Sequence, residues 1–168
     1  MTQTYIFSML FFIAAALYVV FGLYIFSINA KSSLNRLFSL SCLALAIWAF
    51  CFSMANIALD HNSALFLRRM TSLGWGTVYS LMLHFFLTFT GYKGIVKWKW
   101  LYPALYIPAL INVYAFGLSS SAESHYNLIQ TAMGWVNVTT GGLGDYYFNL
   151  YYVIFTLSGL YVVWQMSL

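Results

Sequence analysis

Two neighbouring arginines, Arg68 and Arg69, are the residues best suited to hold an anionic group, because they lie inside a long apolar run. An arginine costs roughly 2.5–3.5 kcal/mol at the centre of a membrane helix and less near the interface. Two interpretations carry equal weight. The side chains extend toward the aqueous boundary, or they pair with Asp60, Asp145 or an anionic ligand.

Aromatic residues accompany these arginines at helical spacing. At about 100° per residue, Arg68 shares a face with Trp75 and Tyr79, which suits an aromatic-lined pocket near one end of the helix. We therefore predict a ligand site between the outer ends of the helices. Its residues are Arg68, Arg69, Trp75, Tyr79, Trp135, Asn137, Asp145 and Asn149.

Small and polar residues form a stripe on each of two consecutive apolar runs. The first stripe is Cys42, Ala46, Ala49, Ser53, Asn56 and Asp60, and the second is Arg69, Ser72, Gly76, Ser80 and His84. Because such residues mark close approach between membrane helices, we expect the two stripes to face each other. Helix packing is the favoured role of Asn56, Asp60, Ser72, Ser80 and His84, and a ligand- or proton-linked switch is the alternative.

Residue patterns typical of enzymes are absent. The sequence has no HExxH, no GxSxG and no phosphate-binding glycine loop, and its carboxylates lie outside the apolar runs. Cys42 and Cys51 are nine positions apart, on opposite sides of a helix, and have no metal-ligand spacing. We expect no catalytic residue, metal site or cofactor in this chain.

The composition indicates a bilayer as the solvent. Of 168 residues, 62% are hydrophobic and 6% charged, whereas about a quarter of a soluble domain is charged. The net charge of +4 comes from basic residues scattered between apolar runs. Basic residues in the connections between apolar runs are typical of membrane proteins and do not form a basic patch, so we expect no nucleic-acid partner.

Five apolar runs have the length of about 20 residues that a membrane helix needs. They cover about 5–28, 37–59, 64–91, 100–118 and 146–168. We predict an all-α transmembrane bundle of five spans in a single domain, 1–168. The last run is still apolar at Leu168, from which we expect a domain truncated at its C-terminus.

The distribution of charge predicts the orientation. With the N-terminus outside and the C-terminus inside, the inner connections hold Lys31, Arg36, Lys93, Lys97 and Lys99, and the outer side holds Asp60, Glu123 and Asp145. This arrangement follows the positive-inside bias.

The outer segment between the fourth and fifth runs, 119–145, is predicted to be partly ordered. Its part from Tyr126 to Val138 suits either an interfacial helix or a short hairpin, and Val136, Val138, Thr139 and Thr140 favour a strand. The segment is rich in apolar residues. We expect it to pack over the outer mouth of the bundle rather than stand free in water.

Four stretches resemble a known family in order and spacing. They are RRMTSLGWG from Arg68, LYPALYIPALINVYAFGL from Leu101, YNLIQTAMGWVNV from Tyr126 and DYYFNLYYVIFTLSGLYVVW from Asp145. Together they are similar to the seven-helix N-terminal sensor region of bacterial membrane histidine kinases and related diguanylate cyclases. The likeness covers essentially the whole chain, with five of the seven helices.

The resemblance implies a sensory input module in the bacterial inner membrane, joined to a cytoplasmic signalling domain of the parent chain. The parent is expected to be the kinase or cyclase, and this segment is not an enzyme. Expected partners are the lipid bilayer, that signalling domain and a small ligand of unspecified chemistry, with a homodimer left open. Two alternatives are a small transporter or channel subunit and a structural module for anchoring and dimerisation.

Overall fold

A computed structural model describes residues 2–91, 98–138 and 141–165, most of which are helical. The long helices are α1 (Thr2–Ile28), α2 (Ser33–Asn56), α3 (His61–Phe89), α5 (Leu101–Val113) and α6 (Leu143–Trp164). Shorter elements are the π-helix η1 (Tyr114–Leu118), the 3₁₀-helix η2 (Ala122–His125) and the strands β1 (Leu128–Thr131) and β2 (Gly134–Asn137).

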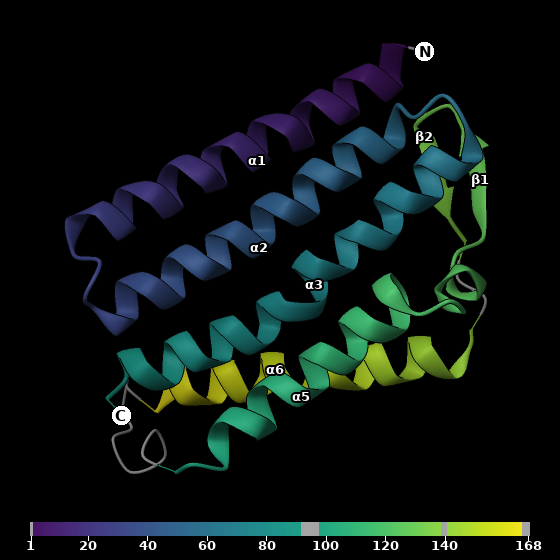
Figure 1. Cartoon of the computed structure of the whole chain (residues 1–168). Coiled ribbons are helices and arrows are strands. Elements are labelled where there is room, and N and C mark those ends of the chain that lie inside the picture. The colour runs from purple at the N-terminus through teal and green to yellow at the C-terminus, as the bar shows by residue number, and fades with distance from the viewer. Residues whose placement is uncertain (1, 92–97, 139–140, 166–168) are drawn as a thin grey trace.

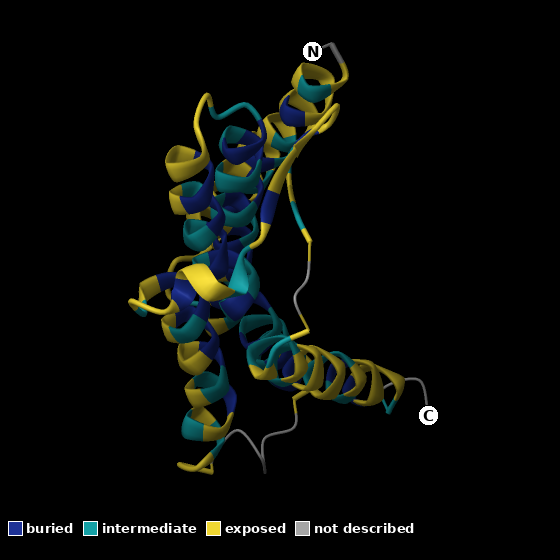
Figure 2. Cartoon of the chain, turned by 90° about the vertical axis from the view of Figure 1, so that its right-hand side faces the viewer, coloured by how far each residue is buried: buried dark blue, intermediate teal, exposed yellow. Residues whose placement is uncertain are grey.

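The helices pack mainly with their neighbours in sequence. α1 lies along α2, α2 lies along α3, and both α5 and α6 contact α3 (Figure 1). Figure 2 shows α6 leading away sideways toward the C-terminus, while α2 and α3 run along the length of the molecule. α3 is therefore the central helix, with α2 on one side and α5 and α6 on another.

The outer surface of the bundle is apolar. On α1, for example, Met9 is 63% exposed and Leu23 is 65% exposed. Four helical segments are long and apolar enough to cross a membrane: Gln3–Ile28, Ser33–Asn56, Leu101–Leu118 and Leu143–Trp164. α3 contains both arginines, and its 29 residues extend about 43 Å, which is also sufficient to cross a bilayer.

The helix boundaries differ from the predicted spans because side chains cap the helices earlier than hydropathy indicates. The Oγ of Ser32 accepts the N–H of Asn35, so α2 begins at Ser33. Asp60 caps α3 in the same way, which places His61 in the helix and moves the turn to 57–60. The predicted inner lysines Lys93 and Lys97, and residues 166–168 of the predicted fifth span, lie outside the described residues.

The segment after α5 contains the hairpin that the sequence left open as one of two possibilities. Leu128 pairs with Asn137 and Thr131 with Gly134, which leaves a two-residue loop. Gly134 has φ +99°, a conformation that L-residues rarely adopt. The predicted strand residues Thr139 and Thr140 lie outside the described part of the chain.

Candidate functional site

Arg68, near the start of α3, connects three elements at the end of the bundle where the hairpin lies. The residue is only 7% exposed. Its Nη2 donates to Oδ1 of Asn56 at 2.8 Å and to the carbonyl oxygen of Trp135. The guanidinium carbon lies 3.9 Å from the centroid of the Phe52 ring, a cation–π contact. One buried cation thus holds α2, α3 and β2 together, and it has no carboxylate partner within residues 2–91, 98–138 and 141–165.

The hairpin is fastened to the same place by further contacts. Nε1 of Trp135 donates to the carbonyl of Ala58 at 2.9 Å, and Leu128 packs in a cluster with Ala64 and Leu65. A Cβ at Gly134 would collide with the backbone of Asn56, so only glycine lets the strand approach the end of α2 this closely. The predicted packing of 126–138 on the bundle is confirmed.

The packing of this segment is one-sided, however. Ile129, Met133 and Val136 are 47%, 55% and 39% exposed. The sequence predicts that their apolar surface is covered as well. Alternation along the strands prevents this, because successive side chains point to opposite faces and only one face can meet the helices.

Tyr126 lies between the two arginines and the end of η1. Its hydroxyl donates to the carbonyl of Phe116 at 3.0 Å. Burial raises the pKa of this phenol well above its usual value, although the positive charges of Arg69 and Arg68 oppose the shift. The side chain is therefore a neutral hydrogen-bond donor between the hairpin and η1.

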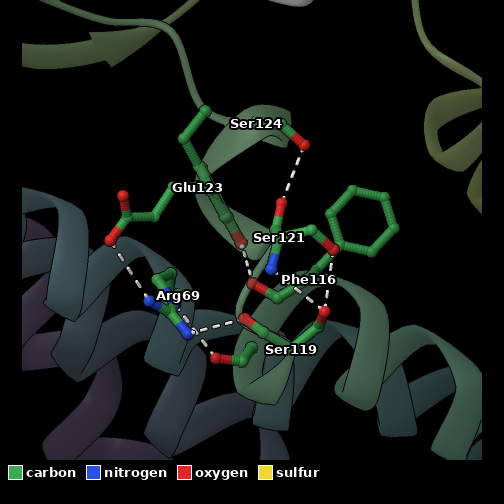
Figure 3. Close-up of polar contacts among 8 residues, drawn as sticks. Arg69, Phe116, Ser119, Ser121, Glu123 and Ser124 are labelled. Carbon is green, nitrogen blue, oxygen red and sulfur yellow. Dashed lines mark hydrogen bonds and ion pairs between the residues drawn. The ribbon is translucent and has the colours of Figure 1, made fainter.

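Arg69 holds a different element from Arg68 (Figure 3). Its Nε donates to the carbonyl of Gly117 at 3.1 Å and its Nη2 to the carbonyl of Ser119 at 3.0 Å. Nη1 lies 3.6 Å from Oε1 of Glu123, a carboxylate that is largely exposed. The guanidinium thus satisfies carbonyls at the C-terminal end of η1, where backbone acceptors lack helical partners.

The structure corrects the predicted partners of the arginines. Asp60 accepts the N–H and the hydroxyl of Ser63, and Asp145 accepts the N–H groups of Gly141 and Gly142. Both carboxylates are engaged at helix N-termini, where they offset the positive end of the helix dipole. The prediction that the arginines pair with Asp60 or Asp145 is wrong, although both arginines do face protein.

Trp75 and Tyr79 belong to an aromatic cluster rather than to a cavity shared with Arg68. The Trp75 ring lies edge-on to Phe116 and Phe148, at centroid distances of 5.1 and 4.5 Å. Tyr79 meets Tyr152 of α6 at 5.0 Å. These rings fill the space between α3, η1 and α6, and such packing stabilises the junction beyond the area that it buries.

The remaining predicted ligand residues are dispersed. Asn137 accepts the N–H of Asn127 through Oδ1 at 2.7 Å, which ties the base of the hairpin. Asn149 lies exposed on α6, and Asp145 caps the same helix. Of the eight predicted residues, Arg68 and Trp135 come into direct contact, and Trp75 and Tyr79 share the Phe148 ring. The predicted set does not surround one hollow.

A cleft of about 280 Å³ lies between the start of α1, the end of α2 and the hairpin turn. Asn56 is one of its lining residues, and Nδ2 of Asn56 is buried without a partner among the described residues. Thr4 closes one side by donating to the carbonyl of Ala132 at 2.7 Å. The sequence analysis missed Thr4 and Gly134. A glycine just before Trp135 is a recognisable turn signal, whereas nothing in the sequence distinguishes Thr4.

The two polar stripes do not face each other, which corrects the expectation. In the stripe on α2, Ser53 exchanges hydrogen bonds with Ser8 of α1, and Cys42 lies against Gly22 of α1. In the stripe on α3, Gly76 packs against Val113 of α5. The reason is that α2 packs against α1 as well as α3, and α3 packs against α5 and α6 as well as α2. The small residues of each stripe therefore also lie at contacts with these other helices.

Ser80 and His84 complete the stripe on α3 with contacts to α5 and α6. The hydroxyl of Ser80 contacts the carbonyl of Leu105 and the hydroxyl of Tyr151, and Nδ1 of His84 lies 2.7 Å from the hydroxyl of Tyr106. Ser72 is fully buried against Gly117. These contacts are those of helix packing. In residues 2–91, 98–138 and 141–165, no three His, Cys, Asp or Glu side chains lie together as metal ligands would.

Comparison with known proteins gives one result. A family model described as the N-terminal 7TM region of histidine kinase matches residues 9–168, nearly the whole chain. No curated protein and no solved structure matches the chain.

Proposed function

The chain belongs to the family of N-terminal 7TM regions of histidine kinases, and we propose that it detects a signal at the extracytoplasmic face or in the bilayer. The family makes it a multi-pass membrane sensor region, consistent with its four long apolar helices. The signal passes to the cytoplasmic signalling domain of the parent kinase, in the bacterial inner membrane.

The charge distribution supports an outer position for the hairpin. Lys31 and Lys99 lie in the connections that precede α2 and α5, and Arg36 lies in the first turn of α2, all at the end of the bundle far from the hairpin. All three carboxylates lie near the hairpin, and Arg68 and Arg69 are bound there to carbonyl groups. The positive-inside bias therefore supports a position of the hairpin outside the cytoplasm.

The contacts of Arg68 carry the proposal. A cation held by Asn56, Trp135 and Phe52 links the hairpin to both helices that lead toward the other side of the membrane. Asn56, which accepts from Arg68, also lines the cleft between α1, α2 and the hairpin turn. A ligand that enters this cleft, or a force on the hairpin, shifts the amide of Asn56 and with it the guanidinium. Packed helices respond to such a shift by small sliding motions.

The test is signalling output per molecule in the full-length parent. Arg68→Gln removes the cation that joins hairpin and helices, and we expect the output or its dependence on the signal to change at near-normal abundance. Arg68→Lys keeps the charge but loses the forked geometry, so its effect is expected to be intermediate. Trp75→Phe, within the aromatic cluster, is expected to shift output less than Arg68→Gln.

Leu87→Ala is the packing control. Leu87 is 5% exposed and lies in the core cluster of α3, α5 and α6, far from the hairpin. Its truncation costs about 2–5 kcal/mol, which lowers abundance but leaves output per molecule unchanged. Wild-type output and wild-type signal dependence in Arg68→Gln, at normal abundance, would remove this junction from the sensing mechanism.

A further inference from the structure

A groove of about 340 Å³ runs between α1 and α2 in the half of the molecule away from the hairpin. Its walls are the aliphatic and aromatic side chains of Val19, Leu23 and Phe26 on α1 and of Leu40 and Leu43 on α2, and Arg36 lies at its end. These five apolar side chains are 43–65% exposed. The groove therefore opens sideways, away from the bundle.

Backbone contacts fix the shape of this groove. The hydroxyl of Ser39 donates to the carbonyl of Gly22 at 2.8 Å, and Nδ2 of Asn35 donates to the carbonyl of Ile25 at 3.0 Å. A Cβ at Gly22 would lie 3.0 Å from Cβ of Cys42, so the two helices approach closely there. The floor is thus preformed by two helices in contact, which lowers the entropic cost of filling it.

The cation at the end of the groove is held in place but has donors to spare. Nε of Arg36 donates to the carbonyl of Ala30 at 2.7 Å, and Nη2 contacts the carbonyl of Lys31 at 3.4 Å. A guanidinium has five N–H donors, so three of them are left by these two bonds. Lys31, in the connection just before α2, adds a second positive charge. Planar N–H pairs of this kind match a phosphate oxygen pair.

We propose that this groove binds an anionic phospholipid, with one acyl chain along Leu40 and Leu43 and the phosphate group at Arg36. From Arg36 to Leu43 the groove follows α2 for about 10 Å. A phosphate group bound at Arg36 would therefore have its acyl chain next to the apolar walls of the groove. Each basic residue near the membrane surface increases the affinity for anionic lipid about fivefold.

A second copy of the chain fits this surface less well than a lipid. α1 and α2 contain no Asp or Glu, and Asp60, Glu123 and Asp145 all lie toward the hairpin end. A copy of α1 or α2 laid along the groove in the same orientation would cover Arg36 without a carboxylate to neutralise it. An uncompensated buried charge is costly, whereas a phosphate supplies the missing negative charge.

Photochemical labelling in nanodiscs tests the proposal with the full-length parent. The discs contain phosphatidylcholine and a small fraction of a diazirine-acyl probe, either phosphatidylglycerol or phosphatidylcholine. We expect the phosphatidylglycerol probe to label residues 19–26 and 40–43 about fivefold more than the phosphatidylcholine probe does. Labelling of the rest of the transmembrane surface should be similar for the two probes, which also checks that the protein is folded.

Four variants separate the contributions. Arg36→Gln should abolish the preference for phosphatidylglycerol in the groove, and Arg36→Lys should retain most of it. Leu43→Trp, at a position 52% exposed, should fill the groove and reduce labelling by both probes. Lys99→Gln is the matched control, because Lys99 is exposed at the same end of the bundle but outside the groove.

Three outcomes would overturn the proposal. The first is equal labelling by the two probes, and the second is a preference that survives Arg36→Gln. The third is an unlabelled groove in the wild-type parent, which would mean that another helix or a second copy occupies it. None of these outcomes depends on signalling output, so they are independent of the sensing role of the hairpin.

Discussion

Adjacent arginines on one helix can fasten different parts of a membrane protein. Arg68 holds the hairpin to α2, whereas Arg69 holds the end of η1. Both use carbonyl oxygens, which are abundant wherever a helix ends. The ion pair of Arg69 with the exposed Glu123 adds at most about 1 kcal/mol, because water screens it. Carbonyl groups, rather than carboxylates, are the main partners of these cations.

Asp60 makes the stability of the folded protein depend on pH, and the hydrogen bonds of its carboxylate determine the direction of this dependence. The backbone N–H of Ser63 is the largest cause of its lowered pKa, followed by the Ser63 hydroxyl, and both favour the carboxylate. The folded protein therefore binds this proton less tightly than the unfolded chain. The resulting stabilisation is complete above the ordinary aspartate pKa of 3.8 and is lost as the pH falls through the lowered value.

We therefore expect the thermal stability of the purified protein in detergent to fall between about pH 5 and pH 2. Asp60→Asn is the control, since asparagine can still cap α3 but does not titrate in this range. Its stability should change less with pH than that of the wild type. Identical pH profiles for the two proteins would contradict the assignment.

At the scale of the elements, a side chain of α6 forms hydrogen bonds with the backbone of α3. The hydroxyl of Tyr151 accepts the N–H of Ser80 at 3.2 Å and donates to the carbonyl of Gly76 at 3.1 Å. These two groups, four residues apart, would pair with each other in a regular helix. The Tyr151 hydroxyl thus gives these two backbone groups a partner on α6 and ties α6 to the middle of α3. α5 meets the same point through the contact of Leu105 with Ser80.

Tyr151→Phe removes this hydroxyl while keeping the ring, which is 3% exposed. The N–H of Ser80 and the carbonyl of Gly76 remain within the continuous helix α3, so the expected loss is limited to the contact between the helices. We predict a decrease of about 1 kcal/mol in the free energy of unfolding, measured by denaturant titration in micelles. Tyr152→Phe, at the neighbouring exposed position, should have no effect. An equal decrease in both variants would refute the bridging role.

Helix content was predictable from hydropathy, but helix partners were not. The five apolar runs correspond to α1, α2, α3, α5 with η1, and α6, because each run is long and nearly free of charge. Whereas Asp60 caps α3, the stripe residues Asn56, Ser72 and Ser80 are buried where elements meet. Their pairing was predicted wrongly, since a stripe shows which face is buried and carries no information about the helix that covers it.

The candidate site was predictable in part for the same reason. A buried arginine requires a polar partner, and Arg68 has one in Asn56. That partner is an amide twelve positions earlier, and a second is a carbonyl 67 positions later, so neither is visible in local spacing. The predicted ligand residues are dispersed in the structure, where Trp75 packs against Phe116 and Phe148.

At the scale of the whole molecule, the bundle has two chemically different ends. The hairpin end holds the three carboxylates and two arginines bound to carbonyls. The opposite end holds Lys31, Arg36 and Lys99, and Arg36 also lies at the groove between α1 and α2. A sensor needs such an asymmetry, because one end must receive the signal while the other remains on the side of its signalling domain.

This asymmetry predicts which residues a membrane-impermeant thiol reagent can reach in intact cells. Ser120 lies in the connection after η1 and Ser33 is the first residue of α2, so these two exposed residues lie at opposite ends of the bundle. With the hairpin end outside, Ser120→Cys should be labelled in intact cells and Ser33→Cys only after permeabilisation. The unsubstituted chain measures the background from Cys42 and Cys51, which lie within α2. Labelling of Ser33→Cys in intact cells would show that the topology is the opposite one. The Arg68 junction would then lie on the cytoplasmic side, where it could not receive an extracytoplasmic signal.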